Sequence, residues 1–197
     1  MAVINQGKFP YISDTKVLIV LLAAMGILLT VTVIPGIFII DEDNYLVTII
    51  ALKQGRLTVP GTENLSPSRE LAYFDPEAHH RIISSTPVTS LVPPLYAFIA
   101  LPFSWLGVRG LIFLNTLAFV TTAFLIFSYT RKFSEGRLTP WIASTVFLLG
   151  SYSIEYAQGL WPQMLSVALC TAPLFLVHDP PKEGFPIRSL LSGLIVG

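Results

Sequence analysis

The chain is poor in charged residues and nearly without cysteine. Only 12% of its 197 residues are charged, and twelve basic residues balance twelve acidic ones to a formal net charge of zero. An average soluble domain has roughly 25% charged residues, and a chain without net positive charge has no general attraction for nucleic acid. The single cysteine, Cys170, excludes a disulfide framework, and its place in an apolar run predicts a buried thiol.

Apolar residues, in contrast, make up 53% of the chain. A bilayer core of about 30 Å needs around 20 helical residues. Runs of this kind predict membrane spans at residues 17–40, 110–129, 138–156 and 160–177, and a fifth run from residue 189 to the end of the chain. Pro35 and Pro173 are expected to kink the first and the fourth span. The predicted fold is an all-α integral membrane protein, a multi-span helical bundle in an inner or plasma membrane.

One apolar run, residues 91–108, is predicted not to cross. Pro93 and Pro94 suit the first turn of a helix, and the dozen or so residues before Gly107 are too few for a comfortable span. We therefore expect a re-entrant or interfacial helix. The N-terminal tail, residues 1–16, and the basic loop 131–137 then share the cytoplasmic side, as the excess of Lys and Arg in cytoplasmic loops favours.

This topology makes residues 41–109 a large extracytoplasmic loop within a transmembrane domain at residues 17–197. Apolar residues from Tyr45 to Leu52 recur at helical spacing, and Gly55 follows as a plausible C-cap. The pattern predicts an amphipathic helix on the membrane surface.

Three carboxylates, Asp41, Glu42 and Asp43, stand where the first apolar run ends. The structural explanation is that they cap the next helix, because a carboxylate gains about 0.3–1 kcal/mol from the dipole at a helix N-terminus. The functional explanation is a site, because charges at a membrane span are functional candidates by default. Both remain open at this point.

The order of these segments resembles the N-terminal part of GT-C fold membrane glycosyltransferases, of the protein O-mannosyltransferase and aminoarabinose-transferase type. The resemblance covers most of the chain from about Val17 onward. The segments that carry it are the apolar anchor, Asp41-Glu42 with Tyr45, the stretch 54–60, Pro93-Pro94-Leu95-Tyr96, the short apolar helix before Gly107, then Arg109, Asn115 and Arg131-Lys132.

The resemblance implies transfer of a sugar from a polyprenyl-phosphate donor to a glycan, lipid or protein acceptor on the extracytoplasmic face. The family's catalytic Asp maps onto Asp41, and Glu42 becomes a supporting acid. A carboxylate suits this chemistry, because removing the proton of the acceptor hydroxyl contributes roughly 10²–10⁴-fold. The resemblance also implies a longer enzyme, of which this chain is the N-terminal portion, with membrane lipids around it and no nucleic acid.

The lipid-phosphate leaving group calls for a cation. Related enzymes often carry Lys or His before the Pro-Pro pair, where this chain has Val92. Further substrate-binding candidates, taken from the outer loop and from the connection after the third span, are Tyr45, Arg69, His80, Arg81 and Glu155.

Asp41 and Asp43 also form an Asp-x-Asp pattern, which in some GT-C enzymes holds Mg²⁺ or Mn²⁺. Such a pattern also arises by chance where acidic residues end a span.

The rival to an enzyme is a non-enzymatic membrane protein, such as a transporter or an assembly subunit. A transporter places ionisable residues at mid-span, whereas the predicted spans carry theirs near the ends.

Overall fold

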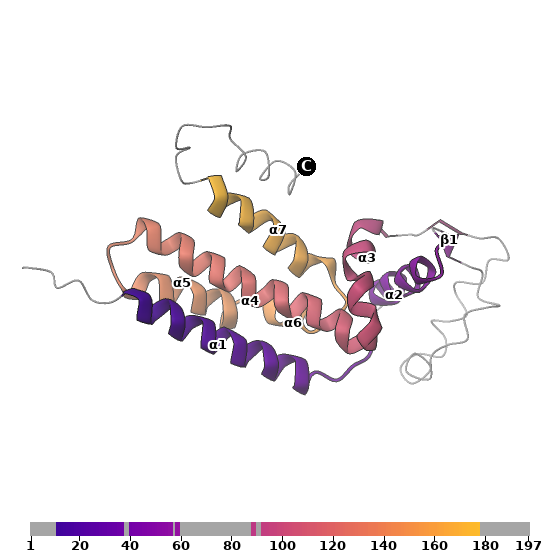
Figure 1. Cartoon of the computed structure of the whole chain (residues 1–197), viewed down its shortest axis with the longest axis horizontal. Coiled ribbons are helices and arrows are strands. Elements are labelled where there is room, and N and C mark those ends of the chain that lie inside the picture. Colours follow the sequence, from indigo (N-terminus) through magenta and orange to yellow (C-terminus); the bar gives the residue numbers. More distant parts are fainter. Residues whose placement is uncertain (1–10, 38–39, 57, 60–87, 90–91, 178–197) are drawn as a thin grey trace, which may run out of the picture.

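The structure is a computed structural model that describes residues 11–37, 40–56, 58–59, 88–89 and 92–177 (Figure 1). These residues are almost entirely helical, as the sequence predicts. The helices are α1 (Tyr11–Thr32), α2 (Ile40–Lys53), α3 (Pro94–Ala100), the 3₁₀ helix η4 (Leu101–Leu106), α4 (Gly107–Phe133), α5 (Leu138–Leu149), α6 (Ser153–Ala157) and α7 (Pro162–Val177). The strands β1 (Thr58–Val59) and β2 (Val88–Thr89) form one short antiparallel pair.

Two stretches of the described chain are long and apolar enough to cross a membrane. They are Asp14–Thr32 within α1 and Pro94–Phe133, which joins α3, η4 and α4. The apolar window of α1 is only 17% buried within the protein. A large apolar surface left open in this way is typical of contact with a membrane or a partner. Further spans remain a prediction.

The first span was predicted over residues 17–40 with a kink at Pro35, and the helix there is shorter. α1 begins at Tyr11, inside the predicted tail, and ends at Thr32, after which residues 33–37 are irregular. Proline removes a backbone donor and disfavours a helical conformation in the residue before it. Pro35 followed by Gly36 therefore stops the helix where a kink was expected.

α4 is the centre of the molecule. It packs against α1, α5 and α7, which surround it along its length (Figure 1). Phe119 and Phe127 are its largest buried side chains, and the ring of Phe127 meets Trp141 of α5 edge to face at 5.0 Å between centroids. The predicted span 110–129 lies wholly inside this helix.

Residues 138–156, predicted as one span, do not form one continuous helix. α5 ends at Leu149, Gly150 closes it by donating its N–H to the Val146 carbonyl, and the five-residue α6 follows. The hydroxyl of Ser151 bonds to the Phe147 carbonyl at 2.6 Å, which offers the helix end an alternative to another helical turn. The twelve residues of α5 cover only about 18 Å.

The predictions for the chain after residue 159 have different outcomes. α7 agrees with the predicted run 160–177 and continues past Pro173. Cys170 on this helix is exposed, which corrects the expected buried thiol. The fifth predicted run lies outside the described residues.

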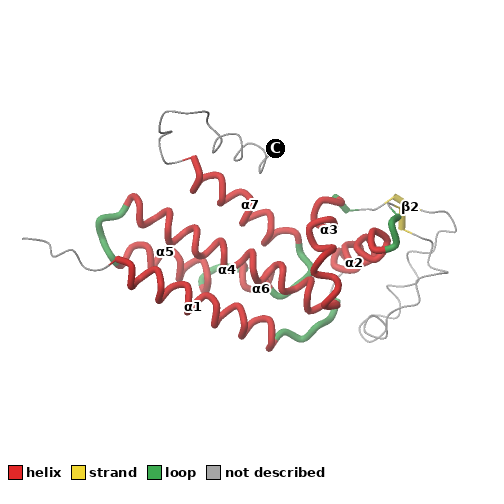
Figure 2. The backbone as a smooth tube through the Cα atoms, in the orientation of Figure 1, coloured by secondary structure: helices red, strands yellow, loops and turns green. Residues whose placement is uncertain are grey.

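The proline-rich run folds as expected into a short helix. Pro93 is the N-cap of α3 and Pro94 its first residue, so their missing N–H groups cost no helical bond. Gly107 has φ 69° and ψ −158°, a conformation that favours glycine, and the chain turns there from η4 into α4. α3 consequently lies across the end of α4 (Figure 2).

The two ends of the molecule are built from different elements (Figures 1 and 2). At one end the start of α1 meets the α4–α5 connection, where Arg137 binds both carboxylate oxygens of Asp14, at 2.9 and 2.6 Å. At the other end lie α2, α3 and the strand pair. Residues 11–16 and the basic loop 131–137, which the sequence assigns to the cytoplasm, are therefore at the same end of the protein.

Candidate functional site

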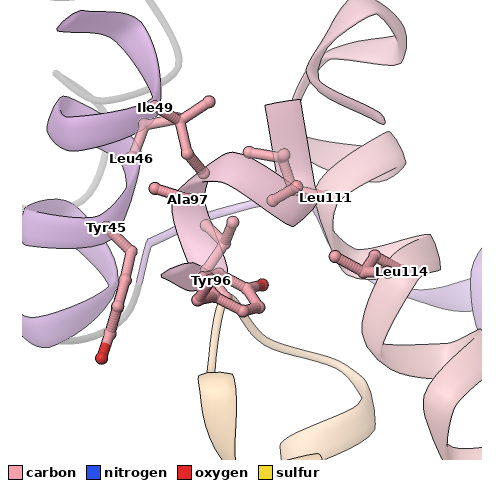
Figure 3. Close-up of a cluster of buried hydrophobic side chains, with 9 residues drawn as sticks. Tyr45, Leu46, Ile49, Tyr96, Ala97, Leu111 and Leu114 are labelled. Atoms are coloured by element: carbon pink, nitrogen blue, oxygen red, sulfur yellow. The ribbon is translucent and has the colours of Figure 1, made fainter. Parts of the chain in front are cut away.

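The candidate site is built on α2, which packs against α3. Its residues Tyr45, Leu46 and Ile49 are buried with Ala97 of α3 and Leu111 of α4 (Figure 3). The helix ends at Lys53, and Gly55 beyond it has φ 72°, in agreement with the predicted C-cap. Burial of the apolar face fixes α2 in place, and with it the acidic residues at its start.

The three carboxylates occupy the first turn of α2, but their surroundings differ. Asp41 is exposed, whereas Glu42 is only 1% and Asp43 6% exposed. Only Asp41 is open to a substrate from solution or from the bilayer edge.

Glu42 points inward and binds a distant part of the chain. Its Oε1 atom accepts a hydrogen bond of 2.9 Å from the backbone N–H of Leu160, in the connection between α6 and α7. Leu160 is fully buried. Through this buried hydrogen bond Glu42 holds the α6–α7 connection under α2.

Asn115 binds the same connection from the other side. This fully buried side chain donates from Nδ2 to the Gly159 carbonyl at 2.6 Å and to the Tyr96 hydroxyl at 3.0 Å. We call Glu42, Tyr96, Asn115 and the peptide of Gly159 and Leu160 the polar node. It joins α2, α3, α4 and the α6–α7 connection at one place.

Glycine is required at position 159. A Cβ atom placed there would overlap the indole of Trp161 and lie 2.5 Å from Oε1 of Glu42. Only a residue without a side chain lets the peptide approach the carboxylate this closely.

Tyr45 lies beside the node. Its ring meets that of Tyr96 edge to face, with 5.1 Å between centroids, and the two hydroxyls point in different directions (Figure 3). Burial, and to a smaller extent the negative charge of Asp41, raises the pKa of the Tyr45 hydroxyl. The group is therefore a neutral phenol at physiological pH, and it can donate a hydrogen bond to a substrate.

The geometry gives little support to a metal on Asp41 and Asp43. Residues two apart on a helix are about 200° apart around its axis and do not face each other. Asp41 is indeed exposed and Asp43 buried. Within the described residues, no three His, Cys, Asp or Glu side chains come together as metal ligands.

The remaining predicted residues divide into two groups. Arg69, His80 and Arg81 lie outside the described residues. Glu155 is exposed on α6. The backbone of the connection after α6 meets the acidic cluster at Leu160, whose N–H donates to Glu42. A substrate contact of Glu155 remains a prediction.

Sequence reasoning did not single out Gly159, and it named Asn115 only as part of the resemblance. Asn115 carried a signal of its own, as a lone amide within the apolar run 110–129. A polar group that must be buried there needs partners. Its partners, however, come from segments far away in the sequence.

Comparisons with protein families, with curated proteins and with solved structures find no match for this chain. Any function therefore has to be argued from the residues described above.

Proposed function

We propose that this chain is part of a GT-C type membrane glycosyltransferase, which transfers a sugar from a polyprenyl-phosphate donor to an acceptor on the extracytoplasmic face. The observation that supports the proposal best is the exposed carboxylate of Asp41. It lies in the first turn of α2, a few residues after a helix long and apolar enough to span a bilayer.

Asp41 acts as the general base in this proposal. Its carboxylate takes the proton of the acceptor hydroxyl while the hydroxyl oxygen attacks the anomeric carbon, and the lipid phosphate leaves with the bonding electrons. Tyr45, about one turn further along the same helix, offers a donor for a hydroxyl or phosphate oxygen. The multi-pass arrangement and the outward position of α2 belong to this proposal.

Glu42 has a different role from the supporting acid expected at first. Its carboxylate is buried and bound to the Leu160 amide, so we assign it to positioning. It fixes the start of α2, and hence Asp41, relative to α4 and α7. Such fixation matters because a displacement of about 1 Å can lower a rate by roughly 10²-fold.

The rival is a non-enzymatic assembly subunit. The burial of Glu42 and Asp43 favours it, since two of the three acidic residues serve the packing of α2 and the third then only caps it. The largely exposed α1 would serve as a surface for partner helices. A transporter has less support, because the buried polar residues near the middle of α4, such as Asn115 and Thr122, are uncharged.

The distinguishing experiment replaces Asp41 by Asn, which keeps the size and removes the base. The protein is reconstituted in vesicles that contain polyprenyl-phosphate hexose or pentose donors, and release of polyprenyl phosphate is measured. We expect Asp41→Asn to lower turnover by at least about 10² with donor binding nearly unchanged. A cap alone would change stability by about 1 kcal/mol or less.

Gln54→Ala, at the exposed far end of α2, is the matched control and should keep full turnover. Circular dichroism verifies that both variants are folded. Near-normal turnover in Asp41→Asn would show that the carboxylate is only a cap. If the complete wild-type enzyme, of which this chain is a part in the proposal, turns over none of the donors, the assembly subunit is favoured.

A further inference from the structure

A second site lies at the opposite end of the molecule from α2. There a cavity of about 200 Å³ opens between the start of α1, the end of α4 and the start of α5. Its lining includes Asp14, Phe127, Arg131, Ser134, Glu135 and Arg137. We call it the end cavity. Its volume is below the roughly 300–1,000 Å³ of sites for drug-sized ligands, so a compact polar group fits it better than a sugar chain.

The charges of the end cavity are mixed and balanced. Two guanidinium groups and two carboxylates contribute to its lining. Arg137 donates two parallel hydrogen bonds to the carboxylate of Asp14, and Arg131 donates to the hydroxyl of Thr15 at 2.8 Å. A simple anion would face the carboxylates and a simple cation the arginines, so the lining suits a ligand that carries both signs.

The chemistry of the side chains narrows the ligand further. Guanidinium groups match the geometry of phosphate oxygens, and carboxylates accept hydrogen bonds from an ammonium group. A phosphate and a primary ammonium two carbons apart make up the phosphoethanolamine group.

The place of the end cavity points to a lipid as the source. Asp14 begins the apolar stretch of α1, and Phe133 ends that of α4. The cavity thus lies at the level where apolar helices reach the headgroups of a bilayer. Phe133 and Leu138, on either side of the loop, expose apolar side chains that can contact acyl chains.

We propose that the end cavity binds the phosphoethanolamine headgroup of a membrane lipid. Arg131 and Arg137 contact the phosphate, and Glu135 accepts hydrogen bonds from the ammonium group. Asp14 holds the guanidinium plane of Arg137 in position. The proposal rests on α1 and α4 crossing the membrane and is independent of any glycosyltransferase activity.

The test compares lipid retention by native mass spectrometry on the full 197-residue chain. Phosphatidylethanolamine, phosphatidylcholine and phosphatidylglycerol with identical acyl chains are offered in equal amounts. Phosphatidylcholine keeps the charges but lacks the N–H donors, and phosphatidylglycerol lacks the ammonium group. We expect phosphatidylethanolamine to be retained about tenfold better than either, the effect of one charged hydrogen bond.

Variants then separate the two halves of the headgroup. Glu135→Gln and Arg131→Gln should each lower retention of phosphatidylethanolamine about tenfold. Thr15→Val removes the hydrogen bond of Arg131 but leaves its charge, and Lys132→Gln removes a neighbouring charge that does not line the end cavity. Both controls should retain the lipid as the wild type does.

Three results would overturn the proposal. Preference for phosphatidylglycerol, with retention unchanged or raised in Glu135→Gln, would show plain attraction of basic residues for anionic lipid. A loss in Lys132→Gln equal to that in Arg131→Gln would show that the end cavity is not the site. Displacement of the lipid by an equal concentration of soluble glycerophosphoethanolamine would show that the ligand is a free metabolite.

Discussion

Gly159→Ala tests the packing at the polar node most directly. The added Cβ would lie 2.5 Å from Oε1 of Glu42, and an ordinary contact begins at 3.4 Å. The oxygen must therefore retreat by about 0.9 Å. The Gly159 peptide cannot retreat instead, since Asn115 holds its carbonyl at 2.6 Å.

The retreat breaks the bond between Glu42 and the Leu160 amide. That bond is 2.9 Å long, and a movement along it by about 0.9 Å takes the atoms well outside the usual 2.7–3.2 Å. Losing a hydrogen bond to a charged group costs about 1.5–3 kcal/mol, and overpacking costs about 1–3 kcal/mol. The two costs are not fully additive, because the movement that breaks the hydrogen bond also relieves the overpacking. We therefore expect the free energy of unfolding to fall by roughly 2–4 kcal/mol.

The assay is unfolding in mixed micelles, followed by circular dichroism. Gly26→Ala, inside α1, is the matched control. The added Cβ would lie 3.6 Å from the Val120 side chain of α4, which is an ordinary contact. Alanine is favoured over glycine inside a helix by about 0.5–1 kcal/mol. The same substitution should therefore stabilise the protein at position 26 and destabilise it at position 159.

A double-mutant cycle identifies the cause. In a Glu42→Ala background there is no carboxylate to displace and only the indole of Trp161 must give way, so Gly159→Ala should cost less there than in the wild-type background. An equal cost in both backgrounds would show that the clash with Trp161 dominates. A cost below about 0.5 kcal/mol in the wild-type background would refute the reasoning about Glu42 altogether.

Three other predictions concern the two ends and the centre of the molecule. After Cys170→Ser, cysteines placed at Gln54 and Ser134 should react with an impermeant maleimide from opposite sides of the membrane, and labelling from one side would contradict the predicted topology. Arg137→Ala should lower the thermal midpoint more than Arg137→Lys, because lysine keeps the charge but not the two-point contact with Asp14; equal midpoints in all three proteins would show that this pair does not join α1 to α5. Asn115→Ala should lower the free energy of unfolding by about 1–3 kcal/mol, because it leaves the buried Gly159 carbonyl without its donor. The control Thr122→Val removes only a hydrogen bond within α4 and should change that free energy by less than about 0.5 kcal/mol. Similar losses in the two variants would show that Asn115 contributes by its volume alone.

The elements that local chemistry determines were predicted well. Pro93 and Pro94 predicted the start of α3, and the spacing from Tyr45 onward with Gly55 predicted α2 and its end. In each case the signal lies within a few residues, in a missing donor or a glycine conformation.

The breaks inside apolar runs were missed for a related reason. Hydropathy averages over a window of about 19 residues, so it treats Pro35-Gly36 and Gly150-Ser151 as minor interruptions. The backbone responds to single residues, and both runs end there as helices.

The contacts of the candidate site depend on segments far apart in the chain. Glu42 and Leu160 are 118 positions apart, and Asn115 and Gly159 are 44 apart. No periodicity or spacing in the sequence links these residues. Their meeting follows from how α2 packs on α3 and α7 packs on α4, which depends on the shape of the whole core.

The acidic cluster shows how the structural and the functional explanation apply together. On a helix, adjacent residues point about 100° apart, so three consecutive carboxylates cannot all face the same environment. Glu42 and Asp43 face the interior, and Glu42 binds α2 to the α6–α7 connection, while Asp41 is left outside. A base is effective only when its surroundings hold it in place. The buried members of the cluster therefore do not weaken the proposed role of Asp41, because they are what would give its carboxylate a fixed position at the surface.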